Sequence, residues 1–275
     1  MGKSAILVGA VIYDPKVALI WEIIKEFFET HGCPMDYVFY SNYKLQVDAL
    51  LGGHIQIAWN SPLAWVDAQQ RSSGRCRAIA MRDTDRDRVT HILAQRGNGV
   101  KTVTDLRGKT LATGAKDSPQ ATLLPLHLLG KRGLTPGRDF AVRRFDVLVG
   151  KHGDHVGGER DALASLQKGE SDACAMLDLN WQTWQADGTA DPNRLAVLAT
   201  TDPYDHCNFT VLESFPKEEE RRWTEALFQM RYDNPAHREM MDLEGLKAWL
   251  PGRTTGYAAL AEAAAQQRFF EEEGA

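Results

Sequence analysis

Two polar segments of the sequence contain most of the side chains that could do chemistry. One is the glycine-rich stretch 151–161, and the other is the stretch 204–208. Their titratable and nucleophilic members include His152, Asp154, His155, Arg160, His206 and Cys207. Near neutral pH an imidazole can donate a hydrogen bond to an anion, ligate a metal or transfer a proton. These segments therefore indicate a polar binding or catalytic site.

The two segments allow three interpretations. In the first, the imidazoles and Arg160 bind an anionic ligand, since a guanidinium contacts a carboxylate or phosphate through two hydrogen bonds. In the second, two histidines with Asp or Cys ligate a transition metal, although His-x-x-His on a loop has no stereotyped spacing. In the third, His155 or His206 is a catalytic acid or base, or Cys207 is a nucleophile. The structural alternative is a solvated loop without a role, and a single cysteine is more often a small buried apolar residue.

A further candidate is the turn at residues 118–122, which leads into a predicted helix. The N-terminus of a helix carries unpaired N–H groups and a partial positive charge, so it favours an anion. The hydroxyls of Ser118 and Thr122 could add donors, as could the amide of Gln120. Pro119 has no N–H to offer. A helix cap at Ser118, with proline at the first helical position, explains the same residues.

Alternating strands and helices have to position these residues. The sequence predicts strands at 5–12, 37–40, 55–59, 91–96, 110–113, 142–145, 173–177, 195–199 and 209–212. It predicts helices at 17–30, 43–51, 62–70, 120–131, 159–168, 181–187, 217–232 and 257–270. In the first helix, apolar residues at 17, 20, 21, 24, 27 and 28 form one face. This alternation is typical of an α/β fold.

Composition and charge exclude several classes of function. The chain has 275 residues, enough for one large or two smaller domains. Its 32 basic and 37 acidic residues give a net charge of −5, and no basic stripe carries interleaved aromatics, so nucleic-acid binding is not indicated. No stretch approaches the roughly eighteen apolar residues of a membrane helix, and the common catalytic and nucleotide-binding motifs are missing. We therefore expect a small-molecule ligand and neither a cofactor nor a metal.

The cysteines and the first residues bear on the cellular compartment. The four cysteines, at 33, 76, 174 and 207, have no CxxC spacing and favour free thiols in a reducing compartment. The apolar run Ala5–Ile12 is predicted as a strand rather than as the core of a secretion signal. The sequence as written therefore predicts a cytoplasmic location, or a periplasmic one if a signal peptide has been removed. An ABC transporter is an expected partner only in the periplasmic case.

Three sequence blocks resemble the phosphate/phosphonate-type substrate-binding proteins of ABC transporters. The first is NYKLQVDALLGGHIQIAWNSPLAW at residues 42–65. The second is DLRGK at 105–109 followed by residues 114–125, and the third runs from Asp161-Ala162 through 169–173 to Asp178. The resemblance covers residues 5 to about 265.

The resemblance implies a type II periplasmic-binding-protein fold. Such a fold has two α/β lobes joined by a two-strand hinge, with the ligand in the cleft between them. Lobe one would comprise residues 1–90 plus 203–275, and lobe two residues 91–202. Closure of the cleft would be a hinge motion, which requires no catalysis.

The predicted ligand-binding residues come from both lobes and from the returning hinge segment. They are Tyr13, Tyr43, Asn60, Ser61, Ser118, Gln120, Thr122, His152, His155, Arg160, Asp161, Asp178 and His206. The sequence departs from the family pattern at Asn60, which replaces a tyrosine, and at Pro119-Gln120, which replace two hydroxyl residues. Asp178 falls where some members hold a ligand amine. A strand-end hydrogen bond for Asp178 and a helix cap for Asp161 are the structural alternatives.

Two hypotheses for function follow. The first is a binding protein for a small anion, a phosphonate, a phosphate ester or a related oxyanion with an amino group. The second is a cytoplasmic enzyme on the same scaffold, which uses His155 and His206 as acid and base, or a metal. It is similar in fold to the binding-protein-like enzymes that process chorismate-derived compounds. Fold alone does not fix function, and we favour binding.

Overall fold

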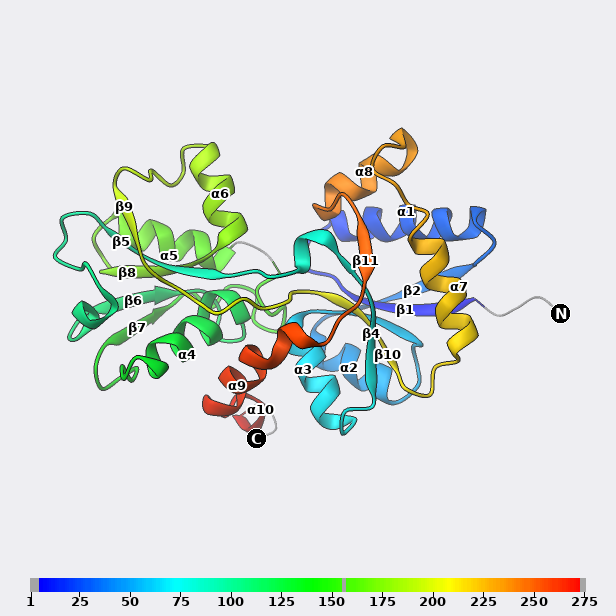
Figure 1. The fold of residues 1–275 in the computed structure, drawn as a ribbon, viewed down its shortest axis with the longest axis horizontal. Helices are drawn as coiled ribbons and strands as arrows, with labels where there is room; N and C mark the ends of the chain where they lie inside the picture. Colours follow the sequence, from blue (N-terminus) through cyan, green and yellow to red (C-terminus); the bar gives the residue numbers. More distant parts are fainter. Residues whose placement is uncertain (1–4, 155–156, 273–275) are drawn as a thin grey trace. The chain divides into compact units, whose positions relative to one another are not determined.

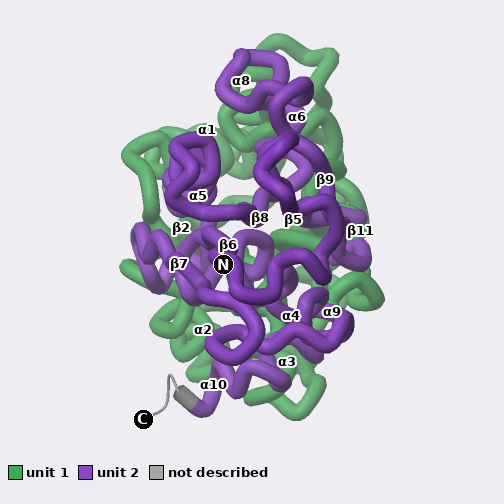
Figure 2. The backbone as a smooth tube through the Cα atoms, turned by 90° about the vertical axis from the view of Figure 1, so that its left-hand side faces the viewer, with its two compact units in different colours: residues 1–86, 205–257 green, residues 87–204, 258–275 purple. Residues whose placement is uncertain are grey.

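A computed structural model describes residues 5–154 and 157–272 and divides the chain into two compact units. Unit 1 comprises residues 1–86 and 205–257, and unit 2 comprises residues 87–204 and 258–275 (Figure 2). The chain enters unit 2 after residue 86 and returns after residue 204, where the sequence predicted crossings after 90 and 202. It enters unit 2 again after residue 257, a third crossing that the sequence did not predict.

Unit 1 is built on a six-stranded sheet of order β11-β4-β10-β3-β1-β2 (Figure 1). The strands are β1 (Ile6–Val11), β2 (Met35–Tyr40), β3 (Ile57–Asn60), β4 (Cys76–Arg82), β10 (Asn208–Leu212) and β11 (Trp249–Pro251). The helices are α1 (Lys16–Thr30), α2 (Tyr43–Leu51), α3 (Pro62–Arg71), α7 (Lys217–Leu227) and α8 (Pro235–Glu244), with the 3₁₀ turns η1 (Asp83–Asp85) and η4 (Thr255–Tyr257). Strands β1, β2 and β3 are parallel, and β10 is antiparallel to its neighbours β3 and β4.

The helices of unit 1 cover both faces of its sheet. Helices α1, α7 and α8 pack on one face, and α2 and α3 on the other (Figure 1). The predicted apolar face of α1 is confirmed, because Val17, Ile20, Trp21, Ile24, Phe27 and Phe28 are its buried residues. These side chains join Phe209 and Trp223 in the main core of the unit. Burial of this stripe removes apolar surface from water and so stabilises the unit.

Unit 2 is built on a five-stranded sheet of order β7-β6-β8-β5-β9. The strands are β5 (Thr90–Gln95), β6 (Thr110–Thr113), β7 (Ala141–Arg144), β8 (Ala173–Leu177) and β9 (Leu195–Thr200). The helices are α4 (Leu124–Lys131), α5 (Gly157–Gln167), α6 (Asp178–Ala186), α9 (Ala258–Gln266) and α10 (Phe269–Glu272), with the short turns η2 (Val103–Leu106) and η3 (Pro119–Leu123). Strands β6, β7 and β8 are parallel, and β5 is antiparallel to β8 and β9.

The C-terminal helix α9 belongs to unit 2, although it was predicted to lie in the first lobe. The physical reason is a set of contacts with α4 and with the turn before it. The Nδ1 atom of His127 lies 2.5 Å from the side-chain oxygen of Gln266, and the Gln267 amide donates to the carbonyl of Leu123 at 2.9 Å. These polar contacts join residues more than 130 positions apart, so local sequence patterns do not reveal them.

Two further features of the described residues bear on the sequence predictions. The four cysteines are buried and free, in agreement with the prediction of free thiols. Among the described helices, none combines the length and the apolar character that crossing a bilayer demands.

Candidate functional site

The predicted ligand residues of unit 1 lie at one edge of its sheet. The parallel strands β1 and β3 end there, next to Tyr13 and to Asn60-Ser61, and α2 begins there at Tyr43. Because β10 runs antiparallel, its first residue, Asn208, pairs with Asn60 at this same edge. Polar groups at the carboxyl ends of parallel strands are the usual ligand-binding positions in α/β sheets.

A chain of buried hydrogen bonds occupies the middle of this edge. The side-chain oxygen of Asn60 accepts from the Gln46 amide at 2.8 Å, and its nitrogen donates to the Thr210 hydroxyl at 3.0 Å. The Thr210 hydroxyl donates to Asn208 at 2.7 Å, and the Asn208 amide donates to the Tyr257 hydroxyl at 3.0 Å. Asn60 is fully buried, and both ends of its amide are engaged within the unit. The network therefore ties α2, β3, β10 and η4 together.

Ser61 and Tyr43 both stand at helix starts. The Ser61 hydroxyl accepts from the backbone N–H of Ala64 at 3.1 Å and caps α3, with Pro62 at its first position. Tyr43 is the first residue of α2 and is 1% exposed. Tyr13 is partly buried against the main core of the unit.

His206 and Cys207 form a buried cluster with Asp85 in unit 1. The Nδ1 atom of His206 lies 3.0 Å from Cys207 Sγ and 3.5 Å from Asp85 Oδ1. One ligand atom from each of these three residues falls within 4.8 Å of the others, which is close enough to hold a metal ion. However, the Arg82 guanidinium donates to both oxygens of Asp85 at 2.8 Å. Although burial opposes its charge, Arg82 holds the pKa of Asp85 well below its usual range. A metal ion at this cluster would have to displace the Arg82 guanidinium from Asp85. The geometry therefore favours an Arg82–Asp85 ion pair over a metal site.

In unit 2, the turn around Ser118 is engaged in its own hydrogen bonds. The Ser118 hydroxyl accepts from the N–H of Ala121 at 3.1 Å and caps η3, with Pro119 at the first position. The Thr122 hydroxyl donates to the carbonyl of Gly114 at 3.1 Å, and the Gln120 amide donates to the carbonyl of Gly153 at 2.7 Å. Ser118 and Thr122 thus have defined structural partners within the unit.

Residues 147–154, here called the covering loop, lie over Ser118 and Gln120. Asp117 holds this loop, because its Oδ2 atom accepts from the N–H groups of Gly150 at 2.6 Å and His152 at 3.2 Å. A Cβ atom at Gly153 would lie 2.3 Å from the Ser118 hydroxyl, so the loop backbone is in close contact with it. The cavity left beside Ser118 has a volume of only about 10 Å³. That is room for about one water molecule.

His152 is the predicted site residue that the covering loop buries. It has a positive φ of 52°, which is uncommon for a residue with a side chain. Burial lowers the pKa of its imidazole to about 4, and the nearby Asp117 only partly opposes this shift. His152 is therefore neutral at pH 7 and does not supply a positive charge to an anion there.

Acidic side chains surround the end of β8 in unit 2. The Oδ2 atom of Asp178 lies 3.3 Å from an Arg88 nitrogen, while its Oδ1 atom is buried and has no hydrogen-bond partner in the described part of the chain. Glu159 is 2% exposed and accepts from the N–H of Leu177 and from the Asn180 amide, both at 2.9 Å. Glu159 was not among the predicted site residues. The sequence feature that could have indicated Glu159 is its position directly after two glycines at the start of a predicted helix.

The remaining predicted residues of unit 2 are more exposed or outside the described ranges. Arg160 is exposed, and its guanidinium lies 5.4 Å from the centre of the Trp184 ring, a cation–π contact. Asp161 is exposed on α5. His155, predicted both as a ligand residue and as an acid or base, lies outside the described residues. His152 and Asp154 belong to unit 2 but His206 and Cys207 to unit 1, so the two polar segments singled out in the sequence are divided between the units.

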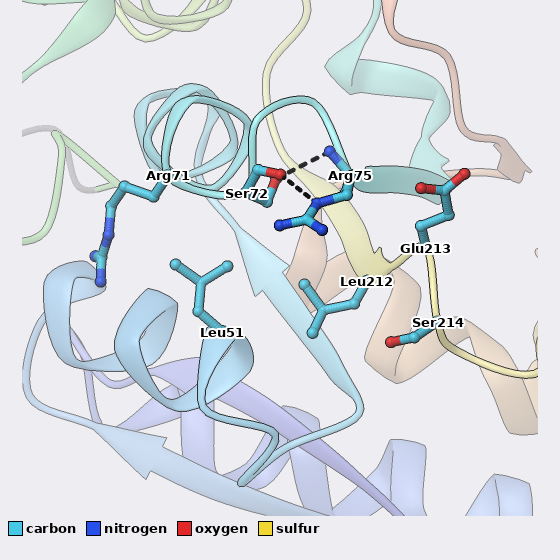
Figure 3. Close-up of a pocket in the computed structure, with 7 residues that line it drawn as sticks. All are labelled: Leu51, Arg71, Ser72, Arg75, Leu212, Glu213 and Ser214. Carbon is cyan, nitrogen blue, oxygen red and sulfur yellow. Dashed lines mark hydrogen bonds between the residues drawn. The ribbon is translucent and has the colours of Figure 1, made fainter.

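A cavity of about 510 Å³ lies at the opposite edge of the unit 1 sheet. Figure 3 shows Leu51 and Leu212 lining it below the Arg75 side chain, which donates to the carbonyl of Ser72 at 2.9 Å. Arg71, also at this cavity, is 2.6 Å from Asp48. None of the predicted ligand residues lines this cavity.

The two sheets share an arrangement that defines the class of protein. In each unit, the first strand after a crossing, β10 in unit 1 and β5 in unit 2, is inserted antiparallel among parallel strands. Two α/β units connected in this way constitute the type II periplasmic-binding-protein fold, which confirms the predicted fold class. Proteins of this class bind small molecules.

Comparisons with known proteins give the family. Residues 17–257 match the family described as "ABC transporter, phosphonate, periplasmic substrate-binding protein", and the chain belongs to this family. The resemblance found in the sequence is thereby confirmed, and the match supports ligand binding rather than the enzymatic alternative.

Solved structures agree on the fold. PhnD1 from Prochlorococcus marinus (MIT 9301), in complex with methylphosphonate, is 15% identical with a TM-score of 0.70, covering 96% of this chain and 98% of that one. XAC2383 from Xanthomonas citri, bound to ATP, is 18% identical with a TM-score of 0.73, covering 98% and 99%. A curated relative, an uncharacterized protein of Haemophilus influenzae, is 64% identical over 31 residues, which is 11% of this chain and 44% of that protein's length. At these identities the structural matches establish the fold alone.

Proposed function

We propose that this chain binds a small oxyanion, a phosphonate or phosphate ester, that also carries an amino group. We further propose that it does so in the periplasm and delivers the ligand to an ABC transporter. The family description supports the oxyanion, the compartment and the transporter. The expectation of a cytoplasmic location has no support from the comparisons.

The amino group is the part of this proposal that rests on the geometry of unit 2. Asp178 is 8% exposed, and its Oδ1 atom is a buried acceptor with no partner in the described ranges. The Oε1 atom of Gln120 and the Oδ1 atom of Asp117 are also buried and have no hydrogen-bond partner in the described ranges. Leaving a buried acceptor without a donor is costly, so a ligand group rich in donors is favoured here. An ammonium group supplies three donors and the positive charge that matches Asp178.

The oxyanion requires donors, and the capped helix start at Ser118 is the proposed source. Ser118 precedes η3, which continues into α4, so the first N–H groups and the partial positive charge there favour an anion. The cavity beside Ser118 is smaller than a phosphonate group, so the proposal requires the covering loop to shift when the anion binds. The hydroxyl of Thr122 donates to the carbonyl of Gly114 and contributes less in this proposal.

Titration calorimetry with a matched pair of ligands tests the proposal. We expect an aminoalkylphosphonate to bind wild-type protein at least about tenfold more tightly than methylphosphonate, because a charged hydrogen bond contributes about 1.5–3 kcal/mol. Asp178→Asn should remove this preference and leave the affinity for methylphosphonate unchanged. Asp161→Asn, an exposed acid on the neighbouring helix α5, is the matched control and should change neither affinity by more than about twofold.

The outcomes separate the two parts of the proposal. If both compounds bind wild-type protein equally well, the oxyanion assignment stands and the amino group is wrong. If neither compound binds, the proposed ligand class is wrong. If Asp161→Asn weakens binding and Asp178→Asn does not, the ammonium site lies at the other acid.

A further inference from the structure

Unit 2 contains a second cavity, on the side of η3 formed by α4 and the C-terminal helices. Its volume is about 400 Å³, within the roughly 300–1,000 Å³ that is usual for small-molecule sites. The lining residues are Lys116, Thr122, Leu123, Leu126, Gly130, Leu134, Thr135, Pro136, Arg144, Gln266, Gln267 and Phe269. Apart from Thr122, whose hydroxyl donates to Gly114, none of them belongs to the predicted ligand set.

The lining of this cavity is polar and apolar in similar measure. Its apolar part is well packed. Leu123, Leu126, Leu134 and Phe269 are each less than a tenth exposed. The C-terminal wall is fixed against α4, because a Cβ atom at Gly130 would lie only 2.8 Å from the Gln266 side chain. Figure 1 shows α9 and α10 following one another at the C-terminal end of the chain, and α9 contacts α4. A packed apolar wall favours a ligand with an apolar body.

Two cations lie at this cavity, and none of the described residues that line it is acidic. Lys116 and Arg144 are both exposed, and the structure gives neither side chain an acidic partner within the described residues. Asp146 is an acid close to Lys116, and its Oδ1 atom accepts from the backbone N–H of Lys116 at 2.7 Å. The neighbouring Arg143 differs, because it forms an ion pair with Glu170 at 3.0 Å. The charge at this cavity is therefore positive and available to an anion.

We propose that this cavity is a second ligand site of the protein, for a carboxylate with an aliphatic body. The carboxylate would pair with Arg144 and Lys116, and the aliphatic chain would lie against Leu126, Leu134 and Phe269. A guanidinium contacts a carboxylate in two parallel hydrogen bonds, so Arg144 is the main anchor. This site is distinct from the proposed oxyanion site and does not depend on it.

Octanoate is the probe for this proposal, and titration calorimetry measures its binding to the full chain. Arg144→Gln should weaken octanoate binding by about tenfold or more, and Lys116→Gln should weaken it by a smaller factor. Arg143→Gln is the matched control, since it removes an arginine from the same strand outside the cavity, and octanoate affinity should stay within about twofold. Both arginines are exposed, so neither change is expected to unfold the protein.

Neutral octanol and the aminoalkylphosphonate complete the test. Octanol should bind more weakly than octanoate by about tenfold, and the aminoalkylphosphonate should not compete with octanoate. Equal binding of octanol and octanoate, or equal losses from Arg143→Gln and Arg144→Gln, would overturn the proposal. Competition between octanoate and the aminoalkylphosphonate would also overturn it, by placing both at one site. Failure of the aminoalkylphosphonate to bind at all would count against the proposed function alone.

Discussion

Two helical segments of this chain begin with the same pair of residues in different surroundings. In unit 1, Ser61-Pro62 starts α3, and in unit 2, Ser118-Pro119 starts η3. Each serine hydroxyl accepts from the N–H three residues on at 3.1 Å. After this shared cap the two differ. Helix α3 continues as a regular α-helix, whereas η3 is a wider π-helical turn in which the Ser118 carbonyl accepts from both Thr122 and Leu123.

The larger difference concerns the chain segment that covers the first turn of the helix. The Ser118 turn is covered by residues 147–154 of the same unit, held by Asp117 and by the Gln120 amide. A Ser-Pro pair determines where a helix starts, because the cap and the proline act within one turn. It does not determine whether the start is open to a ligand, since the covering segment lies about thirty residues further along the chain.

The contact at Gly153 is the first way to test this difference. Gly153→Ala would place a Cβ atom 2.3 Å from the Ser118 hydroxyl at a backbone φ of 74°. We expect a loss of about 4 kcal/mol in the free energy of unfolding, from left-handed strain plus overpacking. Gly137→Ala is the control, because Gly137 has a φ of 78° and nothing within 4 Å, so only the left-handed strain of about 1–2 kcal/mol applies. Urea denaturation measures both, and equal losses would mean that the loop does not pack on Ser118.

The pH dependence of the covering loop is the second test. The imidazole of His152 has a pKa of about 4 in the folded protein, because burial lowers it from 6.5. Between these values the unfolded chain binds a proton that the folded chain does not, so the free energy of unfolding should fall as pH drops from about 6.5 to 4. The contribution is at most about 3 kcal/mol. His152→Asn removes the titrating group and tolerates the positive φ, so its denaturation midpoints should vary less with pH in this window. Parallel pH profiles for the two proteins would contradict the assignment.

The sequence predicted the fold well where local patterns determine it. The buried face of α1 and the bounds of α2, β6 and β8 match the prediction, because each depends on apolar spacing or on a cap within one turn. Strand β4 was not predicted, since arginines at both ends of CRAIAMR obscure its apolar centre. The structure shows how they are accommodated. Arg77 pairs with Glu220, and Arg82 pairs with Asp85 and Glu244.

The candidate site was predicted less completely, because its contacts join distant parts of the chain. Ser118 and Asp178 were predicted from their places at strand and helix ends. Gln46 was not, since its role depends on a bond to Asn60, 14 residues away, and nothing in the local helix pattern separates it from the other polar residues of α2. Asp117 was likewise missed, because the N–H groups that it accepts from lie on the covering loop. Spacing in the sequence indicates which residues share an edge, and only the structure shows which of them already have partners.

The smallest expected effects come from the caps themselves. Ser61→Ala and Ser118→Ala each remove a hydroxyl that accepts one N–H, so each should lower the free energy of unfolding by about 1 kcal/mol. The same variants differ in what they do to ligand binding. If Ser118 is an oxyanion donor as proposed, Ser118→Ala lowers the affinity for the aminoalkylphosphonate by about tenfold in addition to its effect on stability. An unchanged affinity with the same loss of stability would make Ser118 a helix cap alone, equivalent to Ser61 in α3, and the anion would then bind away from the covered turn.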